Sequence, residues 1–283
     1  MIETEPRVLL DDLIFPEGPR WHDGRLWFSD MHAREVVAVD ENGARETIFE
    51  VPGSPSGLGW LPDGRLLVVS MQDRRLLRRD GGRLVEHADL SGLAPFHCND
   101  MVVDARGNAY VGNFGFDLHG GAKLVPTCVM LVTPDGHARV VAENLGFPNG
   151  SVVTPDGATL IVAESFGKVF TAFDIAGDGT LANRRTWGKV SFNPDGIALD
   201  AAGCIWAANP IAPGGFLRIA TGGEITHRID LPDRAGYACA LGGDDRRTLF
   251  LLEAFDSNPH HEPKRGNGRI RTLRVATPGA GLP

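Results

Sequence analysis

The amino-acid sequence predicts an all-β fold, a six-bladed β-propeller built as a single domain from residues 1–283. Three observations predict it. A phrase of apolar strand, polar turn and second apolar strand recurs six times, with starts roughly 39 to 50 residues apart. Apolar and polar residues alternate within the copies, and no segment sustains a helical period. Asp-Gly pairs stand between the apolar runs, where tight hairpin turns are expected.

Each copy of the repeat supplies the short strands of one blade. The copies begin at residues that are mostly small, namely Gly18, Gly57, Asp100, Gly150, Gly196 and Ala240. In the second copy the apolar run 66–69 is followed by a polar turn and by Leu76-Leu77. Asp-Gly pairs starting at Asp23, Asp63 and Asp156 suit type I′ turns, because both central residues of that turn need positive φ.

The ring of blades must close, because a single blade cannot bury both of its faces. Residues Arg7–Leu13 precede the first copy and read as a lone strand. We expect this strand to complete the last blade, next to Arg269–Val275.

Composition excludes several classes of partner. The net charge is −8 and no basic block is interleaved with aromatic residues, so neither nucleic acid nor an anionic membrane is an expected partner. The first residues lack the apolar core of a signal peptide, and no apolar run is long enough to span a membrane. The four cysteines show no CxxC spacing. We therefore expect a cytoplasmic protein with free thiols, a monomer or a weak homo-oligomer.

One register of the repeat carries oxygen-bearing side chains. The residues that stand just before each copy are Glu17, Ser56, Asn99, Asn149, Asp195 and Cys239. Equivalent positions on the inner strands of a propeller converge on the central axis, so these side chains are expected to meet there. Asn and Asp before Gly are also common turn residues, and hydrogen bonds within turns are the competing interpretation.

The donor set in this register favours one divalent metal ion. Carboxylate and amide oxygens, without imidazole or thiolate, suit hard cations such as Ca²⁺, Mg²⁺ or Mn²⁺. Glu17 and Asp195 supply two negative charges, and Asn99 and Asn149 supply neutral oxygens. Ca²⁺ is the cation we favour, with Zn²⁺ or Fe²⁺ as further candidates. Four protein ligands leave positions open for water and substrate.

Four phrases around these residues resemble those of the SMP-30/gluconolactonase/luciferin-regenerating-enzyme family. They are FPEGPRW, HCNDMVVD, FPNGSVVTPDG and NPDGIALD, in an order and spacing that cover nearly the whole chain. The resemblance implies a six-bladed propeller and, in most members, a lactonase that depends on one divalent ion. It implies that Glu17, Asn149 and Asp195 hold the metal and that Asp195 is the general base. Asn99 matches a residue that binds the metal in some relatives and the substrate in others.

The chain departs from the sugar-lactonase pattern near the expected substrate. Those enzymes often carry Arg-x-Asn-Asp, whereas this chain has His97-Cys98-Asn99-Asp100. The expected substrate-binding residues are His97, Asn99, Asn113 and Asp117. His97 could instead shuttle a proton, since imidazole titrates near neutral pH. The predicted activity is hydrolysis of a small lactone, a sugar lactone or another one, by metal-activated water. A related esterase or phosphotriesterase, and a non-catalytic ligand-binding propeller, are the alternatives.

Two further segments are open to interpretation. Phe114–Cys128 is a long insertion in the third copy, and it either covers the channel or forms a plain surface loop. His260-His261 lies in a polar stretch and is expected to be a solvated loop rather than a metal site. Cys98, beside His97, is expected to be a structural thiol and not a nucleophile.

Overall fold

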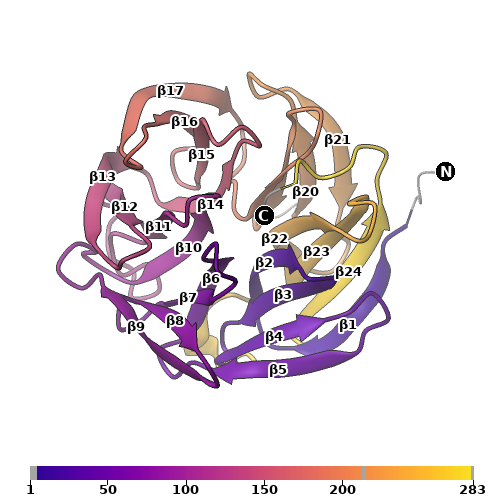
Figure 1. Ribbon diagram of the computed structural model, residues 1–283. Helices are drawn as coiled ribbons and strands as arrows, with labels where there is room; N and C mark the ends of the chain where they lie inside the picture. The colour runs from indigo at the N-terminus through magenta and orange to yellow at the C-terminus, as the bar shows by residue number, and fades with distance from the viewer. Residues whose placement is uncertain (1–4, 212–213, 282–283) are drawn as a thin grey trace.

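The computed structural model describes residues 5–211 and 214–281 and confirms the six-bladed propeller. Within these residues the chain forms six antiparallel sheets of four strands each, together with one short 3-10 helix, η1 (Pro259–His261). Figure 1 shows the sheets arranged around a central axis, with the first strand of each blade innermost. In the described part of the chain no helix is long and apolar enough to cross a membrane.

Successive blades follow one another along the sequence, each running from the axis outward. The first blade comprises β2 (Pro16–His22), β3 (Arg25–Asp30), β4 (Glu35–Val39) and β5 (Arg45–Glu50). The second comprises β6 (Pro55–Trp60), β7 (Leu66–Ser70), β8 (Arg75–Asp80) and β9 (Arg83–Asp89). The third comprises β10 (Cys98–Val103), β11 (Ala109–Asn113), β12 (Thr127–Val132) and β13 (Ala138–Leu145). The last three comprise β14 (Pro148–Val153), β15 (Thr159–Glu164), β16 (Val169–Ile175) and β17 (Leu181–Lys189); β18 (Ile197–Leu199), β19 (Ile205–Asn209), β20 (Gly215–Ile219) and β21 (Ile225–Asp230); and β22 (Ala235–Gly242), β23 (Thr248–Ala254), β24 (Gly268–Arg274) and β1 (Arg7–Leu13).

The last blade closes the ring as expected. Strand β1 pairs antiparallel with β24, in a register that places Arg7 opposite Thr272 and Leu13 opposite Gly268. Because the outer strand comes from the start of the chain and the inner three from its end, the two terminal segments share one sheet. This pairing leaves no blade with an unfilled outer position.

Apolar side chains fill the space between neighbouring blades. Strands β7, β12 and β14 are buried along their whole length, and they read as continuous apolar or small runs. Outer strands such as β21 expose most of their residues. The core is therefore a set of apolar layers between sheets, and it holds the six inner strands in fixed positions around the axis.

Small residues allow the inner strands to approach one another closely. A Cβ atom on Gly57 would collide with the backbone nitrogen of Met101 in the next blade. A Cβ atom on Gly150 would lie 2.5 Å from the backbone nitrogen of Ile197. These contacts explain why small residues recur at the start of the copies, and they place the residue before each copy at the axis.

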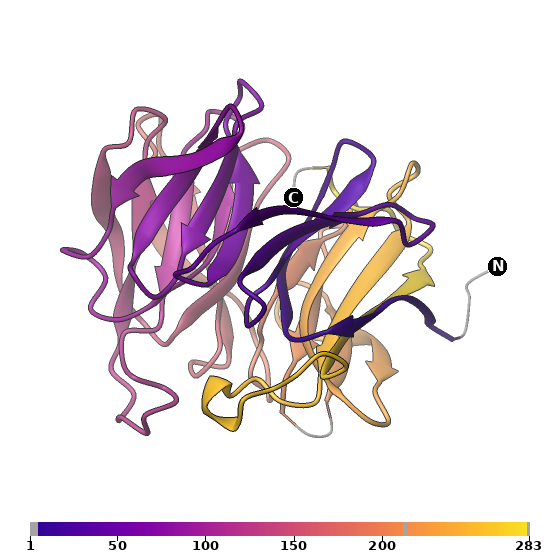
Figure 2. The ribbon, with the colours of Figure 1, turned by 90° about the horizontal axis from the view of Figure 1, so that it is seen from below.

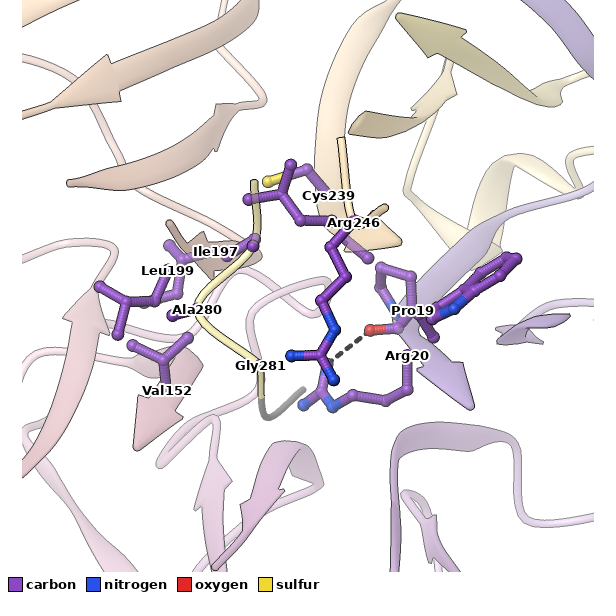
Figure 3. Close-up of a pocket in the computed structure, with 14 residues that line it drawn as sticks. Pro19, Arg20, Val152, Ile197, Leu199, Cys239, Arg246, Ala280 and Gly281 are labelled. Carbon is purple, nitrogen blue, oxygen red and sulfur yellow. Dashed lines mark hydrogen bonds between the residues drawn. The ribbon is translucent and has the colours of Figure 1, made fainter. Parts of the chain in front are cut away.

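The two ends of the channel differ. Figure 2 shows η1 on one face of the molecule and the end of the chain toward the other. On that second face the terminal segment is held by hydrogen bonds from Gly279 N to Arg246 O (2.8 Å) and from Ala280 N to Leu199 O (3.0 Å). Figure 3 shows this segment across a small cavity of about 60 Å³, with the Arg246 guanidinium beside Gly281. The larger opening thus lies on the η1 face.

Candidate functional site

The four predicted metal ligands come together in one cavity. This cavity, of about 540 Å³, opens beside η1 and is lined by Glu17, Asn99, Asn149 and Asp195 from four different blades. Its volume lies in the usual range for small-molecule sites. Three of the residues are the second residue of their inner strand, and Asp195 precedes β18 by two residues. The structure thus brings these side chains together, and metal binding by them stays a prediction.

The sixth position of this ring is Tyr237, and the expectation of Cys239 was wrong. Strand β22 starts at Ala235 and pairs Gly236 with Glu253, as β2 pairs Pro16 with Asp30. The residue equivalent to Glu17 is therefore Tyr237, which lines the cavity. Cys239 lies deeper, with its thiol 3.4 Å from the carbonyl oxygen of Trp206. The sixth copy is the weakest in sequence, and its alignment with the other copies was therefore shifted by two residues.

The two carboxylates in the ring repel each other in a place with little water. Burial, followed by repulsion from Asp195, raises the pKa of Glu17 well above its ordinary value. Burial, followed by repulsion from Asp100, raises the pKa of Asp195 to about 8. The N–H of Gly18 donates to Glu17 Oε2 at 3.0 Å and offsets part of the first effect. A positive charge between these carboxylates would relieve the repulsion.

The two amides present their oxygens to the cavity. Asn99 Nδ2 donates to the carbonyl oxygen of Pro148 (3.4 Å), which can only accept a hydrogen bond. Asn149 Nδ2 donates to Ser165 Oγ (3.1 Å), whose own proton goes to the carbonyl oxygen of Pro194 (2.7 Å). The Asn99 amide nitrogen is therefore committed to a neighbouring chain segment, and the Asn149 side chain hydrogen-bonds both Ser165 and the Asp195 carboxyl, where it partly offsets the rise in the Asp195 pKa. The oxygen Oδ1 of each amide is left for a ligand.

A buried ion pair forms the floor beneath the ring. Arg20 Nη2 lies 3.1 Å from Asp100 Oδ1 and also donates to the carbonyl oxygen of Met101. Arg20 and Asp100 are 4 % and 7 % exposed. Arg20 Nη1 donates to the carbonyl oxygen of Pro19 at 2.8 Å, the contact drawn as a dashed line in Figure 3. Arg20 thus lies between the large cavity and the small one, and its positive charge is paired with the Asp100 carboxylate.

The residues present fit a divalent cation. Oxygen is the only donor element in the ring, two carboxylates carry raised pKa values, and two amide oxygens face them. Across residues 5–211 and 214–281 no three His, Cys, Asp or Glu side chains gather in a way that could hold a metal. A cation at this ring would therefore depend on Asn99 and Asn149 as well as on the carboxylates.

The predicted substrate residues fall into two groups. His97 and Asp117 line the cavity with Asn99, and the insertion 114–126 that carries Asp117 contributes to its wall. Asn113 does not line it, because its side chain is fully buried, donating to Cys128 O (2.9 Å) and accepting from Thr127 Oγ1 (2.5 Å). The structure does not bring Asn113 to the cavity, and its substrate contact stays a prediction that these hydrogen bonds disfavour.

Two further rings of side chains surround the cavity, and apart from His97 their residues were not assigned to the site from the sequence. One ring follows the second strand of the blades and includes Met31, His32, Met71, Gln72, Phe114, Ser165, Phe166, Pro210 and Ile211. The other lies two residues before the Glu17 register and includes Phe15, Ser54, His97, Phe147 and Asn193. Both rings recur with the repeat, so reading every register, and not only one, could have found them.

Comparison with known proteins agrees with this architecture. Residues 15–255 match the family described as SMP-30/Gluconolactonase/LRE-like region. A 6-deoxy-6-sulfogluconolactonase of Pseudomonas putida is 26% identical over 296 residues, covering 100% of this chain and 99% of that protein. The pentonolactonase XacC of Haloferax volcanii is 27% identical over 265 residues, covering 89% of this chain and 85% of that protein.

Solved structures show the same fold. A structure described as a calcium-binding protein, regucalcin, from Agrobacterium tumefaciens strain C58 superposes with a TM-score of 0.81 at 23% identity, covering 99% of this chain and 96% of the other. A luciferin-regenerating enzyme gives a TM-score of 0.80 at 17% identity, covering 97% of each chain. With the family match over most of its length, the chain belongs to the SMP-30/gluconolactonase/LRE-like family.

Proposed function

We propose that this chain is a metal-dependent hydrolase that opens the ester ring of a small lactone. The observation that carries the proposal is the pair of buried, mutually repelling carboxylates, Glu17 and Asp195, facing two amide oxygens in one cavity. The names of the two relatives, a sulfogluconolactonase and a pentonolactonase, support lactones as the substrate class.

Calcium is the cation we propose for the ring. The donors are all oxygen, which favours a hard ion, and the regucalcin structure is described as that of a calcium-binding protein. Glu17, Asn149, Asp195 and Asn99 would hold it. Mg²⁺, Mn²⁺, Zn²⁺ and Fe²⁺ are tested beside Ca²⁺. The charge of the ring and its oxygen donors restrict the charge and the chemical type of the ion more strictly than they restrict its size.

A bound cation would supply a Lewis acid for the lactone carbonyl. Asp195, at the same ring, would take the proton of the attacking water, directly or through a second water that it orients. His97 and Asp117, which line the same cavity, would contact the remaining part of the substrate. Burial of Asn99, Asn149 and Asp195 strengthens the electrostatic interactions at the ring.

The test is a lactone panel on protein stripped of metal, repeated with each of the five cations added back. Activity should vanish on stripping and return with one or more cations. Glu17→Gln should lose most of the activity and bind the cation at least about tenfold more weakly. Glu46→Gln is the matched control, because Glu46 pairs with Arg25 on the exposed surface (3.0 Å). Full activity of the stripped protein, or of Glu17→Gln, would refute the scheme.

A further inference from the structure

One part of the cavity wall above the carboxylate ring is built of aromatic and thioether groups, beside polar residues that include Gln72, His97, His119 and Asn193. Different blades contribute Phe15, Met31, Met71, Phe114, Phe147 and Phe166. The first five are nearly buried in the absence of a ligand, whereas Phe166 is 40 % exposed at the rim. Phe15, Met31, Met71, Phe114 and Phe147 belong to one packed apolar cluster, which also contains Tyr237.

The aromatic rings hold one another in place. On one side the ring centroids of Phe114 and Phe147 lie 4.7 Å apart, and those of Phe147 and Phe166 lie 5.2 Å apart. On another side Phe15 meets Tyr237 edge to face at 4.8 Å. Such contacts fix side-chain rotamers, so the apolar walls are formed before a ligand arrives.

Several polar groups among these walls already have partners. Ser165 Oγ is used by Asn149 and Pro194, and His32 Nε2 lies 3.0 Å from the carbonyl oxygen of Ser257. Asp117 Oδ1 accepts from Gly120 N at 2.8 Å. A polyhydroxylated ring would place hydroxyl groups against carbon on much of its outline, and hydroxyls that lose water without gaining a partner bind poorly.

We propose that the substrate is a lactone that carries an apolar substituent, alkyl or aryl, rather than a polyhydroxylated sugar lactone. The proposal rests on the lactonase function proposed above. The ester group lies at the Glu17–Asp195 ring, and the substituent extends along Phe114 and Phe147 toward Phe166. The relatives named for sugar-acid lactones are about a quarter identical in sequence, which leaves room for a different wall.

The test compares two substrate series on the metal-loaded enzyme. The first is γ-valerolactone and its longer 4-alkyl homologues up to γ-decalactone, and the second is glucono-δ-lactone with xylono-γ-lactone. We expect kcat/KM to rise about three- to fourfold for each of the first added methylenes, the factor for burying a CH₂ group. The sugar lactones should fall at least about tenfold below γ-decalactone. A flat alkyl series, or a sugar lactone preferred over every alkyl lactone, would overturn the proposal.

A variant at the rim locates the substituent. Phe166→Ala should lower kcat/KM for γ-decalactone about fivefold or more and change γ-valerolactone less than about twofold. Phe255→Ala is the matched control, since Phe255 is 57 % exposed, packs on the Arg234 guanidinium 4.2 Å away and does not line the cavity. Equal losses on both lactones in Phe166→Ala would overturn the assigned path of the substituent.

Failure of the lactonase function would be recognised separately. If neither series is hydrolysed with any cation, the proposed function fails, and the affinity of 3-alkylcyclopentanones measured by calorimetry still tests the cavity. These ketones copy the shape of the alkyl lactones and cannot be hydrolysed. Affinity that rises with chain length supports an apolar site, and affinity that does not rise overturns it.

Discussion

Asp195 gives the sharpest test of the charge arrangement, through the stability of the metal-free protein. Its carboxyl is 9 % exposed and faces Glu17 and Asp100, with no cation to balance it in stripped protein. Burial and repulsion raise its pKa from the ordinary value of 3.8 to about 8. Asp195→Asn keeps the shape and removes the charge. The substitution should therefore stabilise the metal-free protein while it abolishes cation binding.

The magnitude follows from linkage between proton binding and folding. Consider a carboxyl whose pKa is higher in the folded than in the unfolded protein. Below the unfolded pKa it does not destabilise the protein, and as the pH rises toward the folded pKa it destabilises the protein progressively. Each unit of difference between the folded and the unfolded pKa corresponds to about 1.4 kcal/mol in the free energy of unfolding. From 3.8 the advantage of Asp195→Asn should grow to about 2 kcal/mol at pH 5 and about 4 kcal/mol at pH 7. These values are upper limits, because Asp195 shares the repulsion with Glu17.

Urea denaturation after chelation, at pH 5, 6 and 7, measures the difference directly. Asp117→Asn is the control, since Asp117 lies at the same cavity with an exposed carboxylate. This variant should not gain the stability that removal of a buried charge gives Asp195→Asn. With Ca²⁺ at about 100 times its dissociation constant the wild type gains about 2.7 kcal/mol that the Asp195→Asn variant lacks. The wild type should then be the more stable protein at pH 5, and the advantage of the variant at pH 7 should shrink by the same amount. A metal-free Asp195→Asn protein that is less stable than the wild type at pH 7 would refute the reasoning.

Other expectations concern the groups around the ring. Ser165→Ala removes the acceptor that orients Asn149, so cation affinity measured by calorimetry should fall about 10- to 100-fold; unchanged affinity would contradict the orienting role. Arg20→Met leaves Asp100 buried without its partner and should cost about 3–5 kcal/mol in urea denaturation, much of it recovered when Asp100→Asn is added. Asn113→Ala should lower stability by about 1–3 kcal/mol and leave KM for the lactone unchanged. A raised KM at unchanged stability would instead favour the substrate contact predicted from the sequence.

The sequence predicted the fold and the carboxylate ring because both depend on a repeat. Each blade contains the same number of strands. Residues at equivalent positions of the repeat must therefore lie at the same height along the central axis. Glu17 and Asn149, more than a hundred positions apart in the chain, could be placed together on this ground alone. The closure by Arg7–Leu13 followed from the same counting.

One error arose where the repeat is weak, and one prediction stays open where a side chain has two possible roles. The sixth copy lacks the Gly that marks most of the others, and Cys239 was taken for the position held by Tyr237. Asn113 is an amide at the end of a strand near the cavity, and periodicity alone does not say whether such a side chain faces the channel or the neighbouring strand. The direction of the Asn113 side chain depends on its hydrogen bonds to Thr127 and Cys128, the first two residues of β12.

The stacking of rings along the axis separates two properties that other folds combine. Different side chains form the two rings, so the charge of the Glu17–Asp195 ring and the apolar character of the ring that holds Met71 and Phe166 can change independently. Substitution of an upper-ring residue such as Phe166 acts on the substrate without touching the cation, whereas Ser165, which orients Asn149, and the lower ring act on both. The proposed chemistry therefore depends on the four oxygen donors, and the walls of this particular chain decide what the cavity accepts.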